Sequence, residues 1–195
     1  MTVWFRRFFS YILSLSTITA VFIYILNLPE FITNAPKLIN EYYYKNAISA
    51  FIFDIFLIAF YISCSMFISK FLKVKPKDNT KQILILAFTT LLISGSFMIY
   101  FLSGGSPNTF FSRWFKKASY RALIYDLILV CSVYILMIII NNKIKSFENN
   151  TNILLPITYL QIYFSWNLFH LNCIRKLSLT FWHQIQENPH GFFFC

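Results

Sequence analysis

The sequence contains four uninterrupted apolar runs, at residues 9–28, 48–68, 83–102 and 122–140. A helix needs roughly 20 apolar residues to cross the hydrocarbon core of a bilayer, and each run has about that length. In lipid a helix satisfies its own backbone hydrogen bonds, whereas a β-barrel would show short runs of alternating hydrophobicity. The runs therefore predict an all-α integral membrane protein, a four-helix bundle formed by residues 1–145.

The charge content excludes an ordinary soluble domain. Only 12% of the residues are charged, against roughly 25% in soluble proteins. The first run follows Arg6 and Arg7, as in a secretory signal, but it has no small-residue cleavage site before Pro29. We therefore interpret residues 9–28 as an uncleaved signal anchor.

The basic residues favour four spans with a cytoplasmic N-terminus. Of the 17 Lys and Arg residues, that topology places eleven on the cytoplasmic side and six on the far side, in agreement with the positive-inside rule. Residues 153–174 are an alternative fifth span, but it would contain Pro156 and His170 and would reduce the bias to nine against eight. We expect residues 146–195 to form an interfacial, aromatic-rich C-terminal segment instead.

One thirteen-residue segment occurs in two similar copies, 72 residues apart. Residues 45–57 read KNAISAFIFDIFL and residues 117–129 read KASYRALIYDLIL, with five identical positions. The alignment extends upstream, where Tyr42 and Tyr43 meet Trp114 and Phe115. An internal duplication of this kind predicts two tandem helix hairpins in parallel orientation.

The duplication aligns Asp54 with Asp126, and both lie in apolar runs where a carboxylate is costly. Each is about two turns, ~9 Å, inside the N-terminal end of its span. The helix dipole stabilises a negative charge there, and the side chains of Lys117 and Arg121 are long enough to reach Asp126. These features favour a role in packing and topology, and an intramembrane polar site on a proton or ion path is the alternative.

Residues 110–121, FFSRWFKKASYR, interleave aromatic and basic side chains. This composition suits a surface that contacts anionic lipid or an acidic protein partner. The residues that we expect to make the contact are Arg113, Trp114, Lys116, Lys117 and Arg121. We expect no nucleic acid as a partner.

No sequence pattern indicates an enzyme. The chain has no HExxH, GxSxG or phosphate-loop motif. His170, Cys173, His183, His190 and Cys195 do not have the spacing of a structural zinc site. We therefore expect no catalytic residues, no metal and no cofactor.

Residues 110–130, FFSRWFKKASYRALIYDLILV, resemble a segment of small uncharacterised multi-span membrane proteins of large nucleocytoplasmic DNA viruses. The resemblance rests on the run from Arg113 to Lys117, on Tyr120 and Ala122, and on the Tyr125-Asp126 pair that opens an apolar helix. It implies a structural or anchoring protein of the inner membrane of a virion, with other membrane proteins or capsid proteins as partners.

Two functions are therefore expected from the sequence. The first is a structural or anchoring membrane protein that holds lipid or an acidic partner through residues 110–121. The alternative is a small ion or proton channel or transporter that uses Asp54 and Asp126. A chain this short would have to form a homo-oligomer to enclose a pore.

Overall fold

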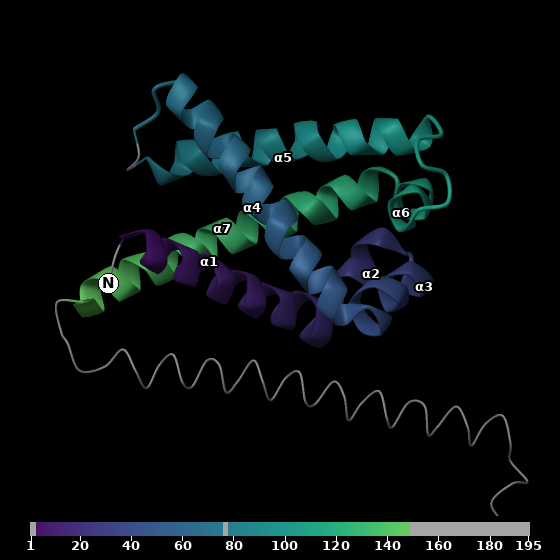
Figure 1. The fold of residues 1–195 in the computed structure, drawn as a ribbon, viewed down its shortest axis with the longest axis horizontal. Coiled ribbons are helices and arrows are strands. Elements are labelled where there is room, and N and C mark those ends of the chain that lie inside the picture. Colours follow the sequence, from purple (N-terminus) through teal and green to yellow (C-terminus); the bar gives the residue numbers. More distant parts are fainter. Residues whose placement is uncertain (1–2, 76–77, 149–195) are drawn as a thin grey trace, which may run out of the picture. The chain divides into compact units, whose positions relative to one another are not determined.

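The computed structural model describes residues 3–75 and 78–148, and every regular element in them is helical (Figure 1). Four helices are long and apolar enough to cross a membrane, as the four apolar runs predict. They are α1 (Val3–Thr19) with its π-helical continuation η1 (Ala20–Ile25), α4 (Ala47–Phe71), α5 (Asn79–Leu102) and α7 (Tyr120–Glu148). The all-α prediction and the number of spans in residues 1–145 are thus confirmed at the level of length and composition. The alternative fifth span lies outside the described residues.

The first and last long helices differ most from the predicted spans, at residues 3–25 against 9–28 and 120–148 against 122–140. The first helix starts at Val3 and stops at Ile25, because Asn27 adopts a left-handed conformation with φ 48°. The last helix continues to Glu148, eight residues beyond the predicted end at residue 140. Hydropathy marks only the part of a helix that suits hydrocarbon, whereas backbone hydrogen bonding continues into polar residues. At 1.5 Å per residue, α7 is about 44 Å long and exceeds the hydrocarbon thickness.

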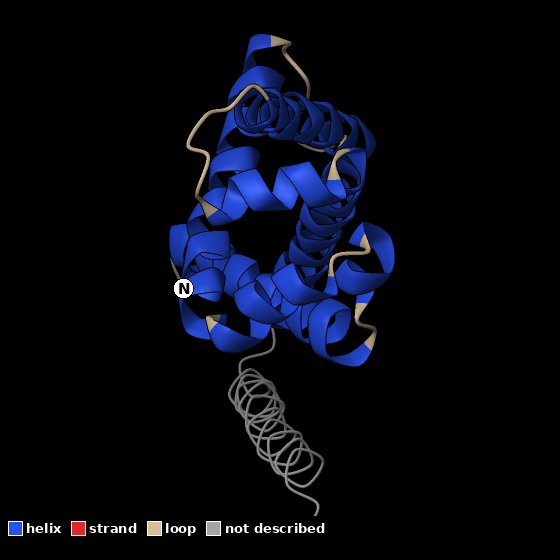
Figure 2. Cartoon of the chain, turned by 90° about the vertical axis from the view of Figure 1, so that its right-hand side faces the viewer, coloured by secondary structure: helices blue, strands red, loops and turns tan. Residues whose placement is uncertain are grey.

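Short helices connect the spans at one end of the bundle, on the right of Figure 1. Between α1 and α4 lie α2 (Leu28–Thr33), α3 (Pro36–Ile39) and the π-helical turn η2 (Asn40–Lys45), and α6 (Phe110–Ala118) precedes α7. Proline opens α3 and is second in α2, where its missing N–H costs no hydrogen bond. Figure 2 views the molecule from this end and shows helices and loops, with no strand among the described residues.

The long helices pack in the order α1, α7, α5, α4. This order corrects the prediction of two separate hairpins: α5 and α7 do pair, but α1 packs along α7, and α4 packs along α5. The predicted hairpins are α1 with α4 and α5 with α7. In the structure, the first helix of each predicted hairpin packs on the second helix of the other. A direct link between α1 and α4 is the 2.6 Å hydrogen bond from the Tyr11 hydroxyl to the Ile55 carbonyl.

The predicted parallel orientation agrees with the structure. Both α4 and α7 begin at the end of the bundle that carries α2, α3 and α6 (Figure 1). Asp54 is seven residues past the start of α4 and Asp126 is six past the start of α7. The two carboxyl groups therefore lie at similar depth from the same end.

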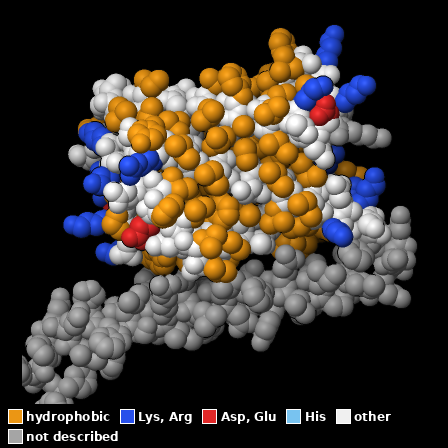
Figure 3. All heavy atoms as spheres, turned by 180° about the vertical axis from the view of Figure 1, so that it is seen from behind, with side chains coloured by type: hydrophobic (Ala, Val, Ile, Leu, Met, Phe, Trp, Pro, Cys, Tyr) orange, Lys and Arg blue, Asp and Glu red, His pale blue; other side chains and the backbone are white. Residues whose placement is uncertain are grey.

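The outer surface of the long helices is apolar. In both α5 and α7, only 22% of the most hydropathic stretch is buried inside the protein. Large apolar side chains such as Phe56, Phe67 and Phe88 are exposed. On the face shown in Figure 3, apolar side chains fill the middle of the molecule, and Lys and Arg gather at its two ends. Soluble monomers rarely expose continuous apolar surface of this kind. The surface therefore suits a lipid environment.

Candidate functional site

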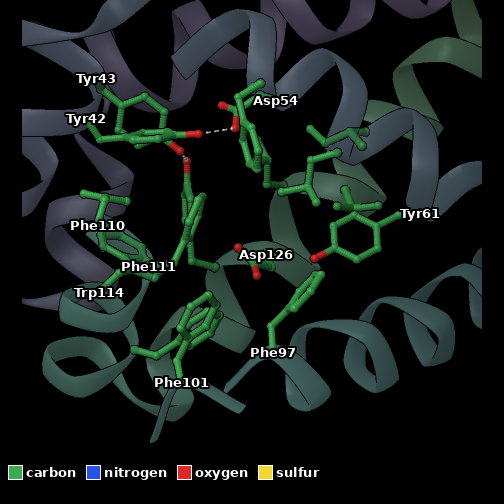
Figure 4. Close-up of a pocket in the computed structure, with 17 residues that line it drawn as sticks. Tyr42, Tyr43, Asp54, Tyr61, Phe97, Phe101, Phe110, Phe111, Trp114 and Asp126 are labelled. Atoms are coloured by element: carbon green, nitrogen blue, oxygen red, sulfur yellow. Dashed lines mark hydrogen bonds between the residues drawn. The ribbon is translucent and has the colours of Figure 1, made fainter. Parts of the chain in front are cut away.

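Asp54 and Asp126 line one pocket of about 330 Å³ inside the bundle (Figure 4). Its walls come from η2, α4, α5, α6 and α7, and most of its lining side chains are aromatic. The sequence places each aspartate near the N-terminal end of its apolar run, and the tertiary structure brings the two aspartates to the same cavity. The lining residues are Tyr42, Tyr43, Phe53, Asp54, Leu57, Ile58, Tyr61, Phe97, Phe101, Phe110, Phe111, Trp114, Phe115, Tyr125, Asp126, Leu129 and Val130.

Hydroxyl groups, rather than cations, partner the two carboxyls. Tyr42 donates its hydroxyl to Asp54 Oδ1 at 2.9 Å, and Ser94 donates to Asp126 Oδ2 at 2.7 Å. Tyr61 lies 2.8 Å from the Ser94 oxygen. Because Ser94 has one hydroxyl proton and gives it to Asp126, Tyr61 must donate to Ser94. The result is a directed chain of hydrogen bonds from Tyr61 through Ser94 to Asp126.

A third polar contact joins the two copies of the repeat. The hydroxyls of Tyr43, in η2, and Tyr125, in α7, lie 3.1 Å apart. Burial, followed by the charge of Asp54 and its hydrogen bond, raises the pKa of Tyr42 far above its ordinary value, and burial does the same to the pKa of Tyr43. Both phenols therefore stay neutral and remain hydrogen-bond donors throughout the physiological pH range.

Helix α6 closes one side of the pocket with aromatic rings. Phe110 stacks on Tyr42 with a centroid distance of 4.7 Å and on Trp114 at 5.9 Å. Trp114 meets Tyr125 edge to face at 6.5 Å, and Phe115 stacks on Phe101 of α5 at 5.8 Å. Such offset and edge-to-face pairs are the favoured aromatic geometries. The wall is thus held by ring contacts to η2, α5 and α7.

The structure separates the five residues that we expected to form one contact surface. Trp114 is only 6% exposed and belongs to the core, so it is not available to lipid or a partner. Arg113 forms a two-pronged ion pair with Glu41, at 2.8 and 2.5 Å. Lys116, Lys117 and Arg121 are exposed. The reason is the helical period of α6, which turns Ser112, Trp114, Phe115 and Ala118 inward and its lysines outward.

The predicted reach of Lys117 or Arg121 to Asp126 does not occur. Among the described residues, Asp126 forms its hydrogen bond with Ser94 and no ion pair with either cation. Two tyrosines of this hydrogen-bond network were not predicted as site residues: Tyr42 was marked only by its alignment with Trp114 in the repeat, and no sequence pattern marks Tyr61. Ser94 was one of several hydroxyl side chains in the spans, and nothing in the sequence distinguished it from the others.

The ion pair between Glu41 and Arg113 leads to a pH prediction. The hydrogen bonds that Arg113 donates to Glu41 lower the pKa of this carboxyl below its ordinary value of 4.5. Because the pKa of Glu41 is lower in the folded protein, the ion pair contributes its full stabilisation above pH 4.5. This contribution is lost as the pH falls through the pKa of the folded state. We expect amide protection in α6 to fall in that acidic range, as measured by hydrogen exchange. Glu41→Gln should show the reduced protection already at pH 7, and unchanged protection in that variant would contradict the prediction.

No group of three or more His, Cys, Asp or Glu side chains in the described part of the chain could hold a metal ion. Comparisons with protein-family models, curated proteins and solved structures found no significant match. What the pocket offers chemically is two carboxyls, four phenol hydroxyls and a surrounding of aromatic faces.

Proposed function

We propose that this chain is an integral membrane protein that binds an organic cation in the aromatic pocket. The observation that carries the proposal is that Asp54 and Asp126 line the same pocket, and that neither forms an ion pair with another described residue. Buried carboxylates are otherwise paired with cations or protonated. A positively charged ligand would supply the missing partner.

The aromatic lining favours an ammonium group with apolar substituents over a bare metal ion. Cations are attracted to the faces of aromatic rings, and quaternary ammonium ligands are recognised by aromatic cages of this kind. Hard inorganic cations instead prefer about six oxygen ligands, whereas most of the lining side chains here present carbon. The cavity, at about 330 Å³, is in the size range of small-molecule sites.

The test compares a charged ligand with its neutral isostere. Purified protein in detergent is titrated by calorimetry with benzyltrimethylammonium and with neopentylbenzene, in which carbon replaces the nitrogen. We expect saturable binding of the ammonium, and binding of the neutral compound at least about tenfold weaker, because it lacks the carboxylate and cation–π terms. Equal affinity for the two compounds would overturn the proposal. Saturable uptake of Na⁺ or protons with no ammonium binding would favour the ion or proton path instead.

A second proposal is the structural or anchoring role in a membrane, including the inner membrane of a virion. It is supported by the exposed Lys116, Lys117 and Arg121 at the end where α6 joins α7. Cations beside an apolar surface are attracted to anionic lipid, each contributing about 1 kcal/mol. This role requires no ligand in the aromatic pocket, so the ammonium titration distinguishes the two proposals. A cytoplasmic N-terminus would place these three cations on the far side of the membrane.

A further inference from the structure

A second pocket, of about 540 Å³, lies at the opposite end of the bundle. It is bounded by the beginning of α1, the end of α4, the beginning of α5 and the C-terminal half of α7. Arg7 and Lys70 line it, and no described lining residue is acidic. Asn79, Gln82 and Asn142 add neutral hydrogen-bonding groups. The pocket therefore presents positive charge and hydrogen-bond donors without a carboxylate to neutralise them.

Ser69 is an independent sign that this pocket accepts a hydrogen-bonding ligand. It lines the pocket, is 3% exposed, and its hydroxyl has no hydrogen-bond partner among the described residues. Other helical serines, such as Ser10, Ser14 and Ser96, donate to the carbonyl four residues earlier. The buried hydroxyls of Thr90 and Ser112 also lack a partner among the described residues, but of the three only Ser69 lines this pocket. A buried hydroxyl without a partner costs about 1–3 kcal/mol. An acceptor in the pocket would remove that cost.

The first turn of α5 adds to the attraction for an anion. Asn79 opens this 24-residue helix and Gln82 follows one turn later. Backbone N–H groups and the positive end of the helix dipole make such a terminus favourable for negative charge. Asp78 satisfies one of these groups, the Lys81 N–H, at 3.2 Å. Lys70 in the last turn of α4 would alone be an ordinary helix-end cation, but here it shares the pocket with Arg7 and Ser69.

We propose that this pocket binds a phosphate group, carried by an anionic phospholipid. Arginine and lysine pair with phosphate oxygens, and the serine hydroxyl donates to one of them. The apolar part of the pocket, which includes Met66, Met137 and Ile138, fits the first carbons of the lipid beyond the headgroup. Lys and Arg at this end border the apolar surface of the spans (Figure 3). The site is separate from the aromatic pocket and does not depend on its ligand.

The test uses full-length protein in a neutral detergent and three short probes: dioctanoyl phosphatidylglycerol, dioctanoyl phosphatidylcholine and inorganic phosphate. Bound lipid is counted by native mass spectrometry, and affinity is taken from the shift in thermal stability. We expect phosphatidylglycerol to bind most tightly. Arg7→Gln combined with Lys70→Gln should weaken its binding roughly 30-fold, at about 1 kcal/mol for each cation. Ser69→Ala should weaken it several-fold by removing one charge-assisted donor.

The matched control is Lys37→Gln with Lys45→Gln, which removes the same charge from two exposed residues in α3 and η2 at the other end of the bundle, neither of which lines this pocket. Unchanged lipid affinity in this control, together with the loss in the Arg7 and Lys70 variant, supports the site. Equal losses in both variants, or equal affinity for phosphatidylcholine, would overturn it, since binding would then follow net charge or acyl chains. Saturation by inorganic phosphate with the same dependence on Arg7 and Lys70 would support the phosphate site and assign free phosphate as its ligand. If the double variant does not fold, Ser69→Ala decides the question.

Discussion

Asp54→Asn combined with Asp126→Asn is expected to weaken ammonium binding roughly 30-fold or more while leaving the protein folded. Removing one partner of a buried charge pair costs about 2–5 kcal/mol, which corresponds to that factor at its lower limit. Asparagine keeps the size of the side chain and an oxygen that can accept from Tyr42 or from Ser94. The native hydrogen bonds, at 2.9 and 2.7 Å, can therefore persist without the charge.

Asp78→Asn is the matched control for this experiment, because Asp78 is the only other aspartate in the chain. It lies at the start of α5, pairs with Lys81 at 3.1 Å and does not line the aromatic pocket. Its replacement should leave ammonium affinity unchanged. Calorimetry gives the affinity, and size-exclusion chromatography and circular dichroism report folding. Wild-type affinity in the double variant would rule out the aspartates as the ligand's partners. A double variant that fails to assemble would instead support the packing role expected from sequence.

Trp114→Ala is expected to destabilise the protein by about 3 kcal/mol, the lower part of the range for removing a buried large aromatic ring. The lower part applies because Trp114 borders an existing cavity, so part of its ring already lacks neighbouring atoms. The substitution removes the stacking of Trp114 on Phe110 within α6 and its edge-to-face contact with Tyr125 of α7. Since α6 forms one wall of the pocket, ammonium binding should weaken as well.

Lys116→Ala serves as the control on the same helix, because Lys116 is exposed and makes no described contact with the pocket. Reversible unfolding in mixed detergent micelles measures the free energy of unfolding for both variants. We expect the control to match the wild type, and Trp114→Phe to recover much of the loss. A Trp114→Ala protein as stable as the control would show that the ring does not anchor α6.

Membrane-like spans, and aspartates near one end of two of them, were predictable because they depend on local properties. The lengths of the apolar runs and the positions of Asp54 and Asp126 within them can be counted directly in the sequence. Glu41 and Arg113 are also 72 residues apart, so the repeat aligns them as equivalent positions. In the structure these two residues form an ion pair. That offset was available from the sequence, but nothing in it indicated that equivalent positions of the two copies meet.

The inward direction of Trp114 was not predictable from its neighbours. Residues 110–121 look like an interfacial segment because aromatic and basic residues alternate there. A helix of nine residues turns one side inward and the other outward, and only the location of α6 across the pocket decides which side faces the core.

Taken by itself, the sequence determines the helical class, the four apolar helices and the depth of the two aspartates, because backbone hydrogen bonding and hydropathy act along a single segment. The tertiary structure alone decides that α1 packs on α7, that Ser94 donates to Asp126, and that both aspartates face one aromatic pocket. The physical reason is that α4, α5 and α7 are apolar on nearly every side, so no hydrophobic stripe marks the face that packs. In such helices the packing face is selected by close fit and by polar contacts between segments far apart in the chain.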